Sequence, residues 1–109
     1  MTTVYKVLGQ SNPAANTMTT VYTVPAGNSA VISSIVICNQ AAANPNVSIA
    51  VCQANTAVTA AQYITRTSNT IAYDSQILTL GITLAATDTI RVESSNANTS
   101  VAIFGSEIY

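Results

Sequence analysis

The stretch Leu78-Thr79-Leu80-Gly81-Ile82-Thr83-Leu84 indicates the fold class most clearly. Its four large apolar residues alternate with small or polar ones, and alternate residues share one side of an extended strand. The same spacing cannot make one face of a helix, which needs a period of about 3.6 residues. Gly81 predicts a bulge or bend, at an interior position where a side chain would obstruct packing. The segment therefore predicts one half-buried β-strand.

The rest of the chain repeats this alternation between clusters of Gly, Pro and Asn, which is typical of short strands joined by turns. The predicted strands are residues 3–8, 17–24, 29–38, 47–53, 62–67, 71–74, 78–84, 89–94 and 101–109. Residues 54–61 form either a loop or a short helical turn. About eight or nine short strands without a long helical pattern predict an all-β antiparallel β-sandwich or jelly roll. At 109 residues, residues 1–109 are expected to form a single β-sandwich domain.

The predicted strand 29–38 is apolar on both of its faces. Strict alternation places Ile32, Val36 and Cys38 on one face, and Val31, Ile35 and Ile37 on the other. A strand of this kind is expected in the centre of its sheet, with both sides covered. In a sandwich only another chain could cover the second side, so this strand predicts an oligomer.

Charged residues make up only 6% of the chain, histidine is absent, and the formal net charge is −1. Three scattered cations cannot form a surface that follows phosphates, which argues against nucleic acid and anionic membranes as partners. No stretch approaches the roughly 18 apolar residues of a membrane helix. The N-terminus shows no signal peptide pattern, so synthesis in a cytoplasm is expected. So little charge leaves copies of the chain without mutual repulsion, which predicts association.

The residues offer little for catalysis or metal binding. A nucleophilic cysteine would have no histidine to serve as its base. Two of the four carboxylates, Asp74, Asp88, Glu93 and Glu107, would have to converge for glycoside hydrolysis, and their spacing does not require it. We therefore expect no enzyme activity, no catalytic residues, no cofactor and no dedicated metal site, although a calcium ion held by Asp and Asn loop oxygens stays open.

Cys38 and Cys52 are predicted to be two free, buried thiols. If residues 47–53 return beside strand 29–38 as a hairpin, the register separates the two cysteines by about 17 Å along the strands. A disulfide requires Cα atoms within about 7 Å of each other. The absence of a bridge agrees with a reducing compartment.

Several stretches resemble a family of small virion structural proteins from tailed bacteriophages, especially phages of marine bacteria and cyanobacteria. They cover most of the chain: residues 6–13 (KVLGQSNP), 22–27 (YTVPAG), 33–39 (SSIVICN), 78–88 (LTLGITLAATD) and 104–108 (FGSEI). The resemblance implies a non-enzymatic, β-rich building block of a phage particle. Members resemble decoration, or cement, proteins bound to the outside of a head, and also modules attached to tails and fibres.

The resemblance leads us to expect a capsid decoration protein on the virion exterior, forming a dimer or trimer that bridges capsomers of the major capsid protein. Terminal position and aromatic character single out the expected contact residues: Val4, Tyr5, Asn12, Pro13, Asn16, Ile108 and Tyr109. A tail, neck or fibre module that binds the host surface is the first alternative. The second is a carbohydrate-binding domain, which five tyrosines would suit and the absence of tryptophan weakens.

Overall fold

The computed structural model describes residues 1–79 and 81–109. Nine strands and one short 3-10 turn lie in this part of the chain. In order they are β1 (Thr3–Ser11), β2 (Thr19–Thr23), β3 (Ser29–Asn39), β4 (Asn46–Cys52), η1 (Gln53–Asn55), β5 (Tyr63–Asn69), β6 (Ser75–Leu78), β7 (Ile82–Leu84), β8 (Thr89–Ser94) and β9 (Thr99–Ile108).

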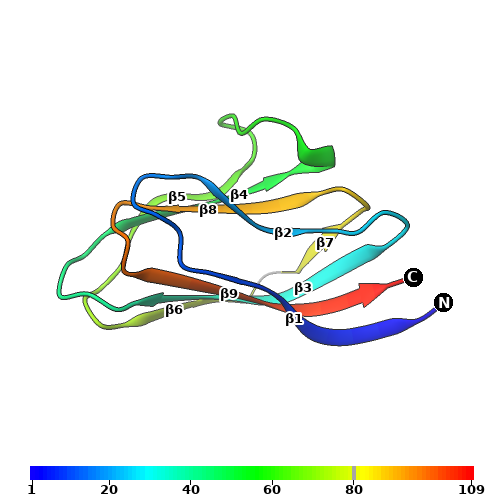
Figure 1. The fold of residues 1–109 in the computed structure, drawn as a ribbon, viewed down its shortest axis with the longest axis horizontal. Coiled ribbons are helices and arrows are strands. Elements are labelled where there is room, and N and C mark those ends of the chain that lie inside the picture. The colour runs from blue at the N-terminus through cyan, green and yellow to red at the C-terminus, as the bar shows by residue number, and fades with distance from the viewer. Residues whose placement is uncertain (80) are drawn as a thin grey trace.

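The strands form two antiparallel sheets packed face to face (Figure 1). The first sheet has the order β1-β9-β3-β6, with β7 also paired to β3, and the second sheet has the order β2-β8-β4-β5. The chain crosses repeatedly between the layers, as in a jelly roll. The predicted antiparallel sandwich is therefore confirmed, and β3 lies centrally in the first sheet as expected.

The core lies between the sheets and is built from β-branched side chains. Ile32, Ile35 and Ile103 contribute from the first sheet, and Ile49 and Ile90 from the second, all at most 1% exposed. β-branched residues suit strands because their restricted rotamers pack well on a pleated surface.

A β-bulge in β3 changes which side chains share a face. The register with β9 shifts between Ile32 and Ser34, so one additional residue is accommodated there, and the Ser33 hydroxyl donates to the Phe104 carbonyl at 3.0 Å. Ile32 consequently points into the core together with Ile35 and Ile37. The expectation that Ile32 shares a face with Val36 and Cys38 was wrong, because an extra residue reverses the alternation.

The predicted hairpin of strands 29–38 and 47–53 was also wrong, because β3 and β4 belong to different sheets. The connection between them crosses the sandwich and is held by the Asn39 side chain. Its amide nitrogen donates to the carbonyls of Ala43 and Ile71 at 2.8 and 2.9 Å. Cys38 and Cys52 are free thiols on opposite layers. Cys52 is buried as predicted, whereas the prediction of a buried Cys38 was wrong, because its side chain lies on the outer side of the first sheet and is only half-buried.

Residues 78–84 do not form one strand. Leu78 ends β6 and Ile82 begins β7, and both short strands pair with β3; the part of the prediction that concerns Leu80 lies outside the described residues. A Cβ atom on Gly81 would meet no atom within 4 Å, so the expected obstruction at this glycine was wrong.

Residues 71–74 form a turn instead of the predicted strand. The Asp74 N–H donates to the Ile71 carbonyl at 3.2 Å, and Tyr73 has a positive φ of 55°. The Asp74 carboxylate then accepts the N–H of Ser75 at 2.8 Å, where β6 begins. Four residues are too few for alternation to separate a strand from a hydrogen-bonded turn.

Candidate interaction surface

The side chains on the outer side of the first sheet form an apolar surface that crosses β1, β9, β3 and β6. The register places Ile77, Val36, Ala102 and Gln10 in one row from β6 to β1. Other apolar side chains continue the surface along β1, β3 and β9. We name as the apolar face these eight residues: Tyr5, Val7, Val31, Val36, Cys38, Ile77, Ala102 and Phe104.

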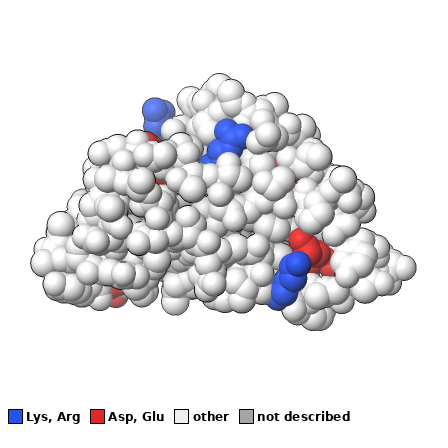
Figure 2. Space-filling model, viewed as in Figure 1, with Lys and Arg blue, Asp and Glu red and all other residues white. Residues whose placement is uncertain are grey.

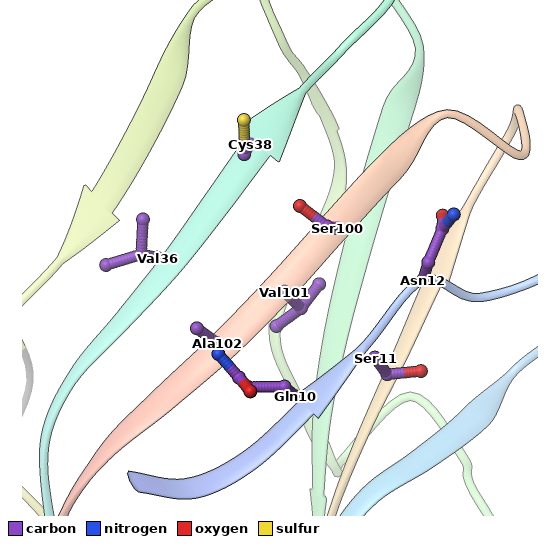
Figure 3. A pocket seen from close by; sticks show the side chains of 8 residues that line it. All are labelled: Gln10, Ser11, Asn12, Val36, Cys38, Ser100, Val101 and Ala102. Carbon is purple, nitrogen blue, oxygen red and sulfur yellow. The ribbon is translucent and has the colours of Figure 1, made fainter.

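Four members of the apolar face are exposed: Tyr5 at 84%, Ile77 at 65%, Val7 at 49% and Val31 at 36%. The face is hollowed in two places. One hollow of about 540 Å³ is lined by Tyr5, Val7, Val31 and Phe104 among others, and the half-exposed Lys6 also borders it. A second, of about 360 Å³, lies where Val36, Cys38, Ser100, Ala102 and Gln10 come together (Figure 3). These depressions could receive protruding side chains of a partner.

No charged residue projects outward from the described strands of the first sheet. Lys6 and Glu107, which belong to this sheet, pair with each other across β1 and β9. Arg66, Arg91 and Glu93 lie on the second sheet. Figure 2, which views the sandwich from the same side as Figure 1, shows the charged residues as a few separate spots. The one charge that borders the apolar face in the described residues is that of Lys6, and Glu107 neutralises it, so the face carries little that would select a charged partner.

The predicted contact residues fall into two groups at opposite ends of β1. The first group lies where β1 begins and β9 ends: Val4, Tyr5, Ile108 and Tyr109. The backbones of Thr2 and Tyr109 hydrogen-bond to each other there. Tyr5 and Tyr109 are exposed, and Val4 and Ile108 are half-buried. Of the seven predicted residues, Tyr5 alone belongs to the apolar face.

The second group follows the end of β1: Asn12, Pro13 and Asn16. Pro13 is buried, and Asn16 adopts a positive φ of 55° while its N–H donates to the Ser94 carbonyl at 2.8 Å. The Asn12 amide, oriented to donate, reaches the carbonyls of Thr99 and Ala97 at 2.8 and 2.9 Å. Asn12 and Asn16 thus tie β1 and the following loop to the β8–β9 connection.

A buried charged cluster joins the two sheets near the chain termini. The Lys6 Nζ lies 2.7 Å from Glu107 Oε1, and the Tyr22 hydroxyl donates to Oε2 at 2.6 Å. Glu107 is only 4% exposed. Because Lys6 and Glu107 lie on paired strands of the first sheet and Tyr22 on the second, the carboxylate links β1, β9 and β2. Sequence reasoning missed this cluster, since it depends on pairing the first strand with the last.

The cluster shifts the pKa values of two of its members. Contacts from the Lys6 ammonium and then the Tyr22 hydroxyl lower the pKa of Glu107, and together they outweigh burial, which acts in the opposite direction. Burial, followed by the hydrogen bond and the negative charge of Glu107, raises the pKa of Tyr22. Both shifts favour a carboxylate that is ionised and a phenol that keeps its proton. This is the arrangement of a structural link.

Two further carboxylates, Asp74 and Asp88, occupy turns at opposite ends of β3. The Asp88 oxygens accept the N–H groups of Ala54 and Ala85, both at 2.8 Å. Within residues 1–79 and 81–109, no three His, Cys, Asp or Glu side chains gather in a way that could hold a metal ion. Asp88 therefore serves to join two loops.

We expect Asp88→Ala to lower the free energy of unfolding by about 2 kcal/mol, because two partly buried N–H groups would lose their acceptor. Urea denaturation followed by circular dichroism measures this. The matched change Asp74→Ala removes an exposed carboxylate that accepts only the adjacent Ser75 N–H, and should cost less than about 1 kcal/mol. If both variants lose the same free energy of unfolding, the role of Asp88 in joining the two loops is contradicted.

In the described residues, no helix has the length and apolar character needed to cross a membrane. No family model matches the sequence, and no curated protein matches it either. Among solved structures, the chain is similar to a chain in the structure of infectious bursal disease virus, Gx strain. The match has a TM-score of 0.54 at 9% identity, and covers 97% of this chain and 31% of the viral one. At this identity the likeness concerns the fold, and this chain spans less than a third of the viral chain's length.

Proposed function

We propose that this protein is a non-enzymatic structural component of a virus particle, which binds neighbouring subunits through the apolar face. The observation that carries the proposal is the partly exposed apolar surface on the outer side of the five-stranded first sheet. Monomeric soluble proteins rarely leave large contiguous apolar patches exposed, and such patches mark interaction sites. The surface is thus suited to adhesion.

The fold supports this proposal without carrying it. Jelly rolls recur in viral capsid domains and in lectins, and one fold can host unrelated functions. The likeness to a chain of a virus structure agrees with the first of these settings. The resemblance of residues 6–13 and 78–88 to phage virion proteins points the same way. Composition adds that a chain with 6% charged residues has little electrostatic protection against association.

The size of the apolar face suits a stable interface. The strands of the first sheet have 9 (β1), 10 (β9), 11 (β3), 4 (β6) and 3 (β7) residues, and at a rise of about 3.4 Å per residue and a spacing of about 4.8 Å they span about 600 Å². A standard protein–protein interface buries about 800 Å² per partner. A contact that covered most of the face would therefore be large enough to persist. Two such faces, one from each of two copies, would also match in being uncharged.

The finer proposal is a decoration protein on the exterior of a tailed phage head, acting as a dimer or trimer that bridges capsomers. A protein that binds only the assembled shell shifts the equilibrium toward the intact shell. A tail, neck or fibre module is the alternative. Measuring the number of copies per purified virion separates the two proposals. A copy number that matches the number of capsomers supports a decoration protein. A copy number that matches the few subunits of one tail or its fibres supports the alternative.

We expect the double variant Tyr5→Lys/Ile77→Lys to weaken self-association at least about tenfold, because two ammonium groups would be buried without partners. Sedimentation velocity over a range of protein concentrations measures the change. Ile64→Lys is the control, since Ile64 is 42% exposed on β5 of the second sheet and should leave association unchanged. The proposal would be refuted if the wild-type protein stays monomeric at every concentration and also fails to bind assembled capsid shells.

A further inference from the structure

The outer side of the second sheet has a different character from the apolar face. Its register places Tyr63, Ala50, Arg91 and Thr20 in one row across β5, β4, β8 and β2. Ala50 is fully buried between its neighbours, and it pairs with Tyr63 on one side and Arg91 on the other. Here polar, aromatic and charged groups stand side by side.

These residues border a hollow of about 440 Å³, which we name the polar hollow. It is lined mainly by Met18, Thr20, Val58, Tyr63, Arg91 and Glu93. The loop that follows β4 forms one wall, and Figure 1 shows this loop standing clear of the second sheet on its outer side. Arg91 anchors the loop by donating to the Asn55 side-chain oxygen. The volume falls within the range of about 300–1,000 Å³ usual for ligand sites.

The charged groups of the polar hollow suit a neutral ligand that carries hydroxyl groups. The Arg91 guanidinium only donates hydrogen bonds, and the Glu93 carboxylate only accepts them. Among the described residues, no side chain donates to the Glu93 carboxylate, so its oxygens are available. Within the lining the charges of Arg91 and Glu93 offset each other, so an anionic ligand would gain at Arg91 and lose at Glu93, and the nearby Arg66 is stacked on the Tyr63 ring. A hydroxyl group can both donate and accept, and neighbouring hydroxyls could serve both side chains.

The apolar groups of the polar hollow suit the carbon–hydrogen face of a ring. Tyr63 is held in place by Arg66, whose guanidinium carbon lies 4.7 Å from the centre of its ring. Met18 and Val58 supply aliphatic surface on other sides. A pyranose ring presents apolar carbon–hydrogen groups on its faces and hydroxyls along its rim, which is the combination that this lining would contact.

We propose that the polar hollow binds a neutral carbohydrate, with one sugar ring packed against Tyr63 and its hydroxyls bonded to Arg91 and Glu93. This goes beyond the structural role proposed above and does not depend on it, because the two surfaces lie on opposite sheets. A particle-bound copy could hold its neighbours by the first sheet and present the polar hollow outward. The chain would then attach the particle to glycans.

The test is binding of the full chain to an array of neutral oligosaccharides built from glucose, galactose, mannose and N-acetylglucosamine. The affinity for the best oligosaccharide is then measured by isothermal titration calorimetry. We expect Glu93→Gln and Tyr63→Ala each to reduce that affinity at least tenfold, and Tyr63→Phe to retain it, because the ring and not the hydroxyl makes the contact.

Tyr73→Ala is the matched control, since Tyr73 is 74% exposed in the turn before β6 and does not line the polar hollow. This variant and the double variant Tyr5→Lys/Ile77→Lys should bind the oligosaccharide like the wild type. Thermal unfolding confirms that each variant is folded before its binding is compared. If the protein binds no oligosaccharide on the array, the proposal is overturned. Binding that survives in both Glu93→Gln and Tyr63→Ala would overturn it as well.

Discussion

Gly105→Ala is expected to destabilise the protein by about 3 kcal/mol or more, or to prevent it from folding. A Cβ atom at this position would collide with the carbonyl oxygen of Val31 and approach the Cα of Ile32 to 3.0 Å. Both are backbone atoms of β3, the central strand of the first sheet, so no side chain can rotate away to relieve the contact. Urea denaturation at neutral pH, followed by circular dichroism, measures the loss.

Gly81→Ala is the control for this prediction, because a Cβ atom there would meet nothing within 4 Å. Its effect on the free energy of unfolding should stay within about 0.5 kcal/mol. Gly9→Ala should fall between the two, since its Cβ would lie 2.5 Å from the Val21 carbonyl oxygen on a strand at the edge of the opposite sheet. A Gly105→Ala variant as stable as Gly81→Ala would show that β3 and β9 can separate easily.

The place of Gly105 in the fold explains the close approach. It pairs with Ile32 directly before the bulge that Ser33 introduces in β3. The bulge brings the backbone of β3 toward β9, and only glycine leaves room for it. Among the four glycines, alternation drew attention to Gly81, which has open space around it. A sequence shows that a glycine is present, but the requirement for it arises from a neighbour distant in the chain.

The positions of most strands could be predicted from the local alternation of apolar and polar residues, but the pairing of the strands and the faces of β3 could not. β8 matches its predicted range of 89–94, with Ile90 and Val92 inward, because each residue in it obeys the period of two. The faces of β3 were misassigned because one bulge residue, Ser33, reverses the alternation beyond it. β4 was placed in the wrong sheet because the pattern of a strand does not state which strand it will pair with.

The apolar face, too, could be predicted only in part, because its residues come from strands that are distant in the sequence. Tyr5 was predicted as a contact residue, and it is the most exposed member of the apolar face. Ile77 was missed because the predicted strands left a gap between residues 74 and 78, where β6 lies. Val7 and Phe104 are directly paired on β1 and β9, almost a hundred residues apart in sequence. Only the strand order brings these residues onto one surface.

Lys6→Met is expected to lower the free energy of unfolding at pH 7 by about 3 kcal/mol, although Lys6 is itself half exposed. The change leaves the Glu107 carboxylate buried with only the Tyr22 hydroxyl as a partner. Glu107→Gln should cost less, about 1–2 kcal/mol, because the Lys6 ammonium can return to water while the amide keeps a hydrogen bond with Tyr22. Removing the more exposed partner should thus be the more damaging change.

The pH dependence separates this ion pair from a packing effect. The pKa of Glu107 is lowered in the folded state, whereas an unfolded chain has a glutamate pKa of about 4.3. The unfolded state therefore binds the proton first, so the stabilisation is complete above about pH 4.3 and is lost as the pH falls through the folded-state value. The stability advantage of wild type over Glu107→Gln should therefore shrink progressively as the pH falls below about 4.3, and the deficit of Lys6→Met should shrink there too.

Arg66→Met provides the control, because it removes one positive charge from a side chain that packs on Tyr63 and lies on the second sheet. Its stability difference from wild type should stay constant as the pH falls from 7 to below about 4.3, where Glu107 takes up its proton. A deficit of Lys6→Met that is equally independent of pH would show that Lys6 acts through its aliphatic stem. In that case the link between the first and last strands would be packing, and the strands would stay joined in acid.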